Sequence, residues 1–191
     1  MINKYKSVAQ KLLLCYYYVV DMLVYREIKK RRVRFMAGND MLDKVDSVDF
    51  AIYLNEKAKK LGKNVNVTKI QKWLYICYGL YLTVNNKQLL NERPQAWNYG
   101  PFFPKVHDMQ KRNGDSLDGL SNRIDSAKFA EYDDVVDATL KNFGDWSASK
   151  LVNWTHESGS AWDKKIKLGE KLGSLDNHDI AMDFERLFSN G

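Results

Sequence analysis

Cysteine and proline are scarce in this 191-residue chain, which contains two cysteines and three prolines. Only Cys77 lies in the region 41–191, so a disulfide within that region is excluded, and two lone cysteines are typical of a protein in a reducing compartment. We therefore predict a cytoplasmic protein. Few prolines and long stretches with a 3.6-residue apolar period favour a mainly α-helical fold.

The main part of the chain also lacks a charge surplus. The formal net charge is +6, and residues 1–40, with nine Lys or Arg against three Asp or Glu, account for all of it. Phosphate binding requires a concentrated basic surface. Nucleic acid is therefore not an expected partner of residues 41–191, and any such contact falls to the basic residues 1–40 or to a local cluster of basic side chains.

A long, uninterrupted hydrophobic run is missing as well. The apolar stretch Leu12–Tyr25 is short for a membrane span, contains Asp21 and follows Lys11. It has no small-residue cleavage site and ends in a basic cluster, which argues against a signal peptide. We expect no transmembrane span, but residues 1–40 remain open to interpretation as a helix on a membrane surface or a helix docked on the domain.

A third interpretation is that residues 1–40 are not translated in nature. Arg31-Arg32 can be encoded by a purine run that resembles a bacterial ribosome-binding site, a few codons before Met36 and Met41. The hypothesis is that translation begins at one of these two methionines. Recovery of a peptide from residues 5–25 by mass spectrometry of the native protein would exclude it. We accordingly divide the chain into a basic extension, 1–40, and one domain, 41–191.

The strongest structural signal lies at Thr68–Val84. Apolar side chains recur there at helical spacing, and Tyr75, Ile76, Tyr78 and Leu82 make the rest of the surface apolar too. A helix that is apolar nearly all round is normally buried on several sides. The sequence therefore predicts a compact helical domain around this central helix, with a capping box formed by Thr68 and Gln71 at its start.

Weaker patterns predict the remaining elements. Gly100-Pro101 is expected to form a turn, and residues 88–90 and 95–99 a short β-hairpin. Further helices are predicted at 47–61, from Pro104 to about Arg112, from about 126–130 to 143, at 147–155, after Ser160, and at 177–188.

Three blocks of the sequence resemble those of the Panacea domain family, which includes SocA-type antitoxins and GepA-like phage-associated proteins. They are Lys69–Gly79, then Ala96–Pro101 with Pro104 and Val106, and Leu151–Trp162. They are similar in order and spacing to the family patterns KLQKLLYYAQG, AWxYGPVxPxV and LxxLTHxxxxPW. The resemblance covers roughly residues 47–188, with departures at Ser160-Ala161 and Phe102-Phe103.

This resemblance implies a non-catalytic antitoxin of a toxin–antitoxin system, of the kind that prophages carry. It would neutralise a cognate toxin, encoded by an adjacent gene, by direct binding, and would also serve as an adaptor to a cellular protease. The alternative from the residues themselves is an interaction protein that binds nucleic acid or a membrane surface through its basic N-terminal arm.

Two loops carry the candidate binding residues, and we expect them to meet in space. The first contains a Gly-Pro turn flanked by aromatic residues, which is either ordinary architecture or the frame of a binding groove. In the second, a histidine at a helix end either caps carbonyl groups or joins the same recognition surface. The candidate partner-binding residues are Trp97, Tyr99, Gly100, Pro101, Pro104, Thr155, His156 and Trp162.

Catalytic and metal sites are not expected. A thiol hydrolase would need Cys77 beside a base such as His156, but Cys77 lies on the most buried face of the central helix, where a thiol behaves as a small apolar group. The three histidines, His107, His156 and His178, do not have the spacing of metal ligands. No cofactor is predicted.

Overall fold

The computed structural model describes residues 44–189, with side chains described up to residue 186. The predictions for the extension 1–40, including the alternative start at Met36 or Met41, lie outside the described residues. Within them the chain is mainly α-helical, as predicted. The elements are α2 (Ser47–Lys60), α3 (Val67–Asn85), β1 (Gln95–Trp97), β2 (Gly100–Phe102), α4 (Pro104–Arg112), η1 (Ser121–Arg123), η2 (Ser126–Tyr132), α5 (Asp133–Phe143), α6 (Ala148–Thr155), α7 (Ala161–Lys167) and α8 (Asn177–Ser189).

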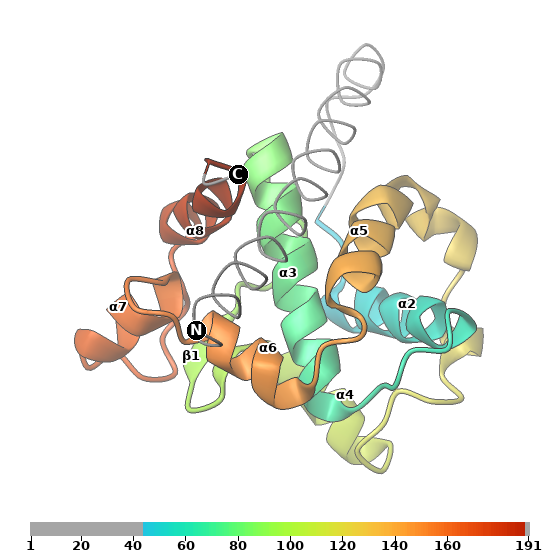
Figure 1. The fold of residues 1–191 in the computed structure, drawn as a ribbon. Helices are drawn as coiled ribbons and strands as arrows, with labels where there is room; N and C mark the ends of the chain where they lie inside the picture. Colours follow the sequence, from blue (N-terminus) through green and yellow to red (C-terminus); the bar gives the residue numbers. More distant parts are fainter. Residues whose placement is uncertain (1–43, 190–191) are drawn as a thin grey trace, which may run out of the picture.

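Helix α3 is the centre of the fold, which confirms the main sequence prediction. It runs through the middle of the molecule and packs against α8 on one side and α5 on the other (Figure 1). Trp73, Cys77 and Tyr78 have no exposed surface. Gly79 lets α8 approach closely, because a Cβ atom at this position would overlap the ring of Phe184. The apolar surface all round α3 is thus explained by neighbours on several sides.

The predicted capping box at the start of α3 is wrong. The helix begins at Val67, and its N-cap is Asn66, whose side chain accepts a hydrogen bond from the Lys69 N–H at 2.9 Å. Gln71 is buried and binds Phe103 instead: its Oε1 accepts from the Phe103 N–H at 2.8 Å. Gln71 therefore ties α3 to the segment after β2 rather than closing its own helix.

A short β-hairpin is present, but the predicted pairing of residues 88–90 with 95–99 is wrong. β1 pairs antiparallel with β2, placing Ala96 opposite Pro101 and Trp97 opposite Gly100. Residue Leu90 instead forms a parallel bridge with Val45. The turn lies at Asn98-Tyr99, so Gly100-Pro101 begins the second strand instead of forming the turn itself.

Gly100 has a positive φ of 94°, a conformation that glycine adopts far more readily than residues with a Cβ atom. The opposed residue Ala96 uses its backbone N–H and C=O to bind Gly173 and Leu172 outside the hairpin. Pro101, across from it, therefore loses no ladder hydrogen bond by lacking an N–H.

The other helix boundaries follow their local signals. Gly62, with a φ of 67°, follows the end of α2. Ser147 and Ser160 cap α6 and α7, and Pro104 opens α4 as predicted. Among residues 44–189, no helix combines the length and apolar character needed to cross a bilayer.

Candidate functional site

The two loops singled out in the sequence meet at one place. The indole Nε1–H of Trp162 donates a hydrogen bond to the Trp97 carbonyl oxygen at 2.7 Å. The imidazole of His156 stacks flat on the Trp162 ring, with centroids 3.7 Å apart and an interplanar angle of 2°. We call this contact between the hairpin, residues 95–102, and the segment 155–162 the junction.

Gly100 lies at the tightest point of the junction. A Cβ atom at this position would be 2.6 Å from Thr155 Oγ1, 2.8 Å from Lys72 Nζ and 3.2 Å from His156 Nε2. The first two distances are shorter than a carbon atom tolerates, and the positive φ is also unfavourable for other residues. Glycine is therefore required here both by the backbone and by the surrounding side chains.

Lys72 lies beneath the junction and was not among the predicted site residues. Its side chain comes from α3, is 1% exposed, and donates a hydrogen bond from Nζ to the Pro101 carbonyl oxygen at 2.8 Å. Burial lowers the pKa of Lys72 to about 7. The sequence contained a signal for the burial of Lys72. A lysine within a helix that is apolar on every face has no solvent-facing side.

His156 ends α6 through its backbone N–H, which reaches the Val152 carbonyl. Its ring does not act as a carbonyl cap: the Nε2 atom is buried and has no hydrogen-bond partner among the described residues. Burial, and secondarily the nearby Lys72, lower the pKa of His156. The neutral, flat-stacked imidazole is the form that this environment favours.

The predicted residues divide into buried supports and an accessible face. Gly100, Pro101 and Thr155 are buried, whereas Pro104 is half-buried and opens α4. Tyr99, at the turn of the hairpin, is 76% exposed. The two loops also carry half-buried aromatic side chains; they are Trp97, Phe102 and Trp162.

Phe102 and His107 extend this aromatic group, although neither was among the predicted site residues. Phe102 stacks on Trp97 with ring centroids 4.3 Å apart, and the His107 ring meets Phe102 nearly edge-on at 5.0 Å. The Nδ1 atom of His107 is buried without a hydrogen-bond partner among the described residues. The antiparallel register explains the first contact, since Phe102 lies opposite Gln95, two residues from Trp97 on the same face.

A second loop adds exposed apolar residues beside the hairpin. The Leu172 N–H donates to the Ala96 carbonyl oxygen at 2.9 Å, which joins the segment between α7 and α8 to the outer edge of β1. Leu172 is 58% exposed and has a positive φ of 62°, and Leu168 is 70% exposed. A non-glycine residue in this conformation costs energy and is often found at functional sites. The sequence marked this segment only by its glycines.

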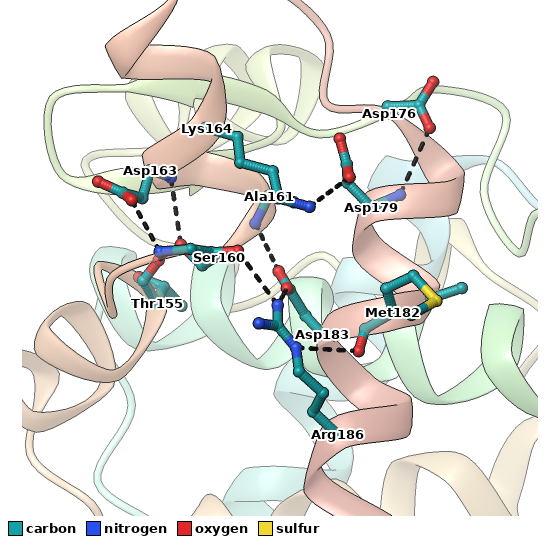
Figure 2. Close-up of polar contacts among 12 residues, drawn as sticks. Thr155, Ser160, Ala161, Asp163, Lys164, Asp176, Asp179, Met182, Asp183 and Arg186 are labelled. Atoms are coloured by element: carbon teal, nitrogen blue, oxygen red, sulfur yellow. Dashed lines mark hydrogen bonds and ion pairs between the residues drawn. The ribbon is translucent and has the colours of Figure 1, made fainter.

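Helix α8 fixes the far side of the junction (Figure 2). Asp183 accepts a hydrogen bond from the Ala161 N–H at 2.5 Å, and Arg186 donates from Nη2 to the Gly159 carbonyl oxygen at 3.1 Å while pairing with Asp183. The Gly159 N–H in turn donates to Asp163 at 2.7 Å. These contacts hold the segment before α7 in place, so that His156 and Trp162 have defined positions.

The thiol of Cys77 has surroundings unlike those of a nucleophile. It is fully buried, its Sγ lies 3.2 Å from Thr139 Oγ1 on α5, and burial raises its pKa to about 12. In the described part of the chain, no three His, Cys, Asp or Glu side chains gather as a metal-binding group.

Known proteins are similar in sequence to the part of the chain that contains both loops. The family described as "Antitoxin SocA-like, Panacea domain" matches residues 70–163, a range that runs from α3 to the first turn of α7 and includes the junction. The chain is also 30% identical over 130 residues to antitoxin SocA of Caulobacter vibrioides (strain NA1000 / CB15N), an alignment covering 62% of this chain and 69% of that protein. The comparison with solved structures gave no match. The chain therefore belongs to the SocA-like antitoxin family with a Panacea domain.

Proposed function

We propose that this protein is an antitoxin that neutralises a toxin by binding it directly. Membership of the SocA-like antitoxin family supports the antitoxin role. The single observation that carries the proposed docking surface is Tyr99, a large aromatic side chain that is 76% exposed at the turn of a hairpin. We assign to the toxin the accessible apolar side chains of the hairpin and of the segments that contact it, which are Tyr99, Trp97, Trp162, Leu168 and Leu172, and we call this set the Tyr99 face.

The hairpin is well suited to binding because its backbone is held on several sides. Lys72 binds the Pro101 carbonyl from below, Trp162 binds the Trp97 carbonyl, and the segment around Leu172 pairs with β1. A tyrosine has few rotatable bonds, so its immobilisation in a complex costs little entropy. Tyrosine and tryptophan also dominate the energetically important positions of protein interfaces.

The proposed role is binding and not catalysis. The polar groups gathered at the junction are covered by the hairpin: Lys72 is 1% exposed, and the His156 Nε2 atom is buried. A substrate would have no access to them without separating the two loops. Their contacts support the shape of the surface above them.

We further propose a source, a location and a fate for the bound toxin. The toxin is the product of an adjacent gene, the complex forms in the cytoplasm, and a cellular protease receives the bound toxin. Family membership supports a toxin as the kind of partner. Blocking and degradation predict different lifetimes for the toxin in the cell.

The test is co-expression with each small neighbouring gene. One neighbouring product is expected to arrest growth when expressed alone, and this chain is expected to restore growth and to co-purify with that product. The toxin's half-life, measured with and without the antitoxin, separates blocking, which leaves it unchanged or longer, from protease delivery, which shortens it. If no neighbouring product is toxic or binds this chain, the antitoxin proposal is contradicted for this protein.

A further inference from the structure

Two basic groups occupy one buried site at the junction. Lys72 Nζ and His156 Nε2 lie 2.8 and 3.2 Å from the same point, the Cβ position built on Gly100. The two nitrogen atoms are therefore within about 6 Å of each other. One belongs to the central helix and the other to the end of α6, and the hairpin covers both.

Among the residues that the structure describes, no acidic group balances this pair. The hairpin residues 95–102 include no Asp, Glu, Lys, Arg or His. Burial lowers the pKa of Lys72, and no charge on a described residue offsets this effect. Burial also lowers the pKa of His156, and the charge that adds to this effect is that of Lys72.

The charged groups on the neighbouring elements face other partners. On α3 and α6, Lys69 binds the Gly144 carbonyl and Lys150 lies over the Trp146 ring. Asp163 of α7 is bound by Gly159 and Lys167, and Asp183 of α8 is bound by Ala161 and Arg186. His107 of α4 packs against Phe102, and Glu157 is exposed. None of these contacts supplies a counter-charge to the junction.

Burial of a cation without a counter-ion is unfavourable, and two cations at this distance also repel each other. In its neutral form Lys72 still donates an N–H to the Pro101 carbonyl, and neutral His156 still stacks on Trp162. Protonation of Lys72 or His156 places an uncompensated charge in this buried site. Separation of the hairpin from the segment 155–162 admits water and relieves this cost.

We propose that Lys72 and His156 form a proton-sensitive latch, which holds the hairpin closed on the segment 155–162 when unprotonated and opens the junction on proton uptake. If the proposed function also holds, toxin binding through the Tyr99 face weakens as the pH falls. That consequence rests on the proposed function, whereas the latch itself is a property of the isolated protein.

The direction of the pH dependence follows from linkage. In the open junction Lys72 returns toward its ordinary pKa of 10.5, against about 7 in the closed one. The open form therefore binds more protons between these values, and the closed form gains stability as the pH rises from about 7 toward 10.5. His156 acts in the same direction below its ordinary pKa of 6.5.

Two indole N–H groups provide a readout of the latch in the full-length chain. Trp162 Nε1 donates across the junction to Trp97, whereas Trp73 Nε1 donates within the core to the Phe143 carbonyl. Solvent exchange of both protons is measured by NMR between pH 6 and 9, and their protection is expressed as a ratio, which cancels the intrinsic pH dependence of exchange. The protection of the Trp162 proton relative to that of the Trp73 proton is expected to fall roughly tenfold or more as the pH is lowered. A tenfold change corresponds to a shift of one pKa unit in the group that controls opening of the junction.

Two substitutions of Lys72 separate a latch from a merely structural lysine. Lys72→Met removes the lysine charge, so the ratio is expected to stay high and independent of pH between pH 7 and 9, above the ordinary pKa of 6.5 of the remaining His156. Lys72→Arg keeps the charge at every pH, so the ratio is expected to stay low and independent of pH. If Lys72 has only a structural role, both variants are expected to lower the ratio equally at all pH values. That result would overturn the proposal. An unchanged ratio across the pH range in the unmodified protein also overturns it.

The titration of the His156 ring supplies a second, local measurement. Lys72→Met is expected to raise the pKa of His156, because it removes the nearby cation. Lys69→Met is the matched control, since Lys69 is also a buried lysine of α3 that binds one carbonyl, that of Gly144. Identical titration of His156 in the unmodified protein and in Lys72→Met contradicts the proposed pairing. These experiments need no toxin, so their outcome is independent of the antitoxin proposal.

Discussion

Two buried lysines on the same helix have different surroundings. Lys69 donates to the Gly144 carbonyl at 2.9 Å and lies over the Trp73 ring at 4.7 Å; burial lowers its pKa, and the nearby Asp145 partly offsets that effect. Lys72, one turn later, donates to the Pro101 carbonyl and has no such offsetting charge among the described residues. The first joins α3 to the end of α5, in the core. The second joins α3 to the hairpin, so a single helix organises both the stability of the domain and the shape of its exposed loop.

The core is expected to respond most strongly to substitution. Trp73 has no exposed surface, so Trp73→Ala leaves a cavity, removes the ring beneath Lys69 and is expected to lower the free energy of unfolding by about 3–5 kcal/mol. Urea denaturation followed by circular dichroism measures this loss. Tyr99→Ala, at an exposed position, is the comparison and is expected to change stability by less than about 0.5 kcal/mol. Equal effects would contradict the separation of core from binding face.

The junction is expected to respond at Gly100. Gly100→Ala is expected to cost about 2–4 kcal/mol, from a positive φ combined with overlap against Thr155 and Lys72. Gly62→Ala is the matched control, because Gly62 also has a positive φ but nothing lies within 4 Å of its Cβ position. That control is expected to cost about 1 kcal/mol, and the difference measures the close packing of the junction. No difference would show that the junction tolerates a methyl group.

The pH dependence of stability tests the environment of Lys72. Because the pKa of Lys72 is about 7 when folded and 10.5 when unfolded, raising the pH from 7 to 9 is expected to add about 2 kcal/mol to the free energy of unfolding through this residue. The free energy of unfolding is measured by chemical denaturation at both pH values, in the unmodified protein and in Lys72→Met. The contribution of Lys72 is the part of the slope of this free energy against pH that is lost in Lys72→Met. A slope that survives Lys72→Met would assign the effect to other groups.

The smallest expected effect is at the rim of the junction. Arg186 binds the Gly159 carbonyl and Asp183, but its side chain is 51% exposed. Arg186→Met is therefore expected to lower the free energy of unfolding by less than about 1 kcal/mol, since exposed ion pairs contribute little. Thermal unfolding at low and high salt measures it. A loss of several kcal/mol would mean that α8 supports the junction far more strongly than its exposure indicates.

Regular spacing made much of this fold predictable. The central helix, the cap at Ser160 and the helix opening at Pro104 were all correctly predicted, because each depends on residues close together in sequence. The errors arose where the hydrogen-bond partner or strand partner of a residue lies far away in the sequence. Gln71 matches a capping box, but Phe103 offers its backbone to the same side chain. Residues 88–90 match a strand, but Val45 rather than β1 bridges Leu90.

The candidate site was predictable only in part, for the same reason. The family blocks marked the two loops, and the structure brings them together through Trp162 and Trp97. Lys72 was missed because its role depends on Pro101, a residue 29 positions away. The exposed leucines were missed because no sequence pattern distinguishes a solvent-facing Leu172 from a buried one. Exposure is decided by what the rest of the chain covers.

The central claim, that the Tyr99 face binds a toxin, is tested most directly by the affinity of a single variant. The dissociation constant for the toxic neighbouring gene product is measured by calorimetry for the unmodified protein, for Tyr99→Ala and for Leu61→Ala. Leu61 is a suitable control because it is also exposed, at 54%, but follows α2 instead of lying on the hairpin. Tyr99→Ala is expected to weaken binding by roughly 30-fold, or about 2 kcal/mol, and Leu61→Ala to leave it unchanged. Equal affinity of the Tyr99→Ala variant and the unmodified protein would contradict the account.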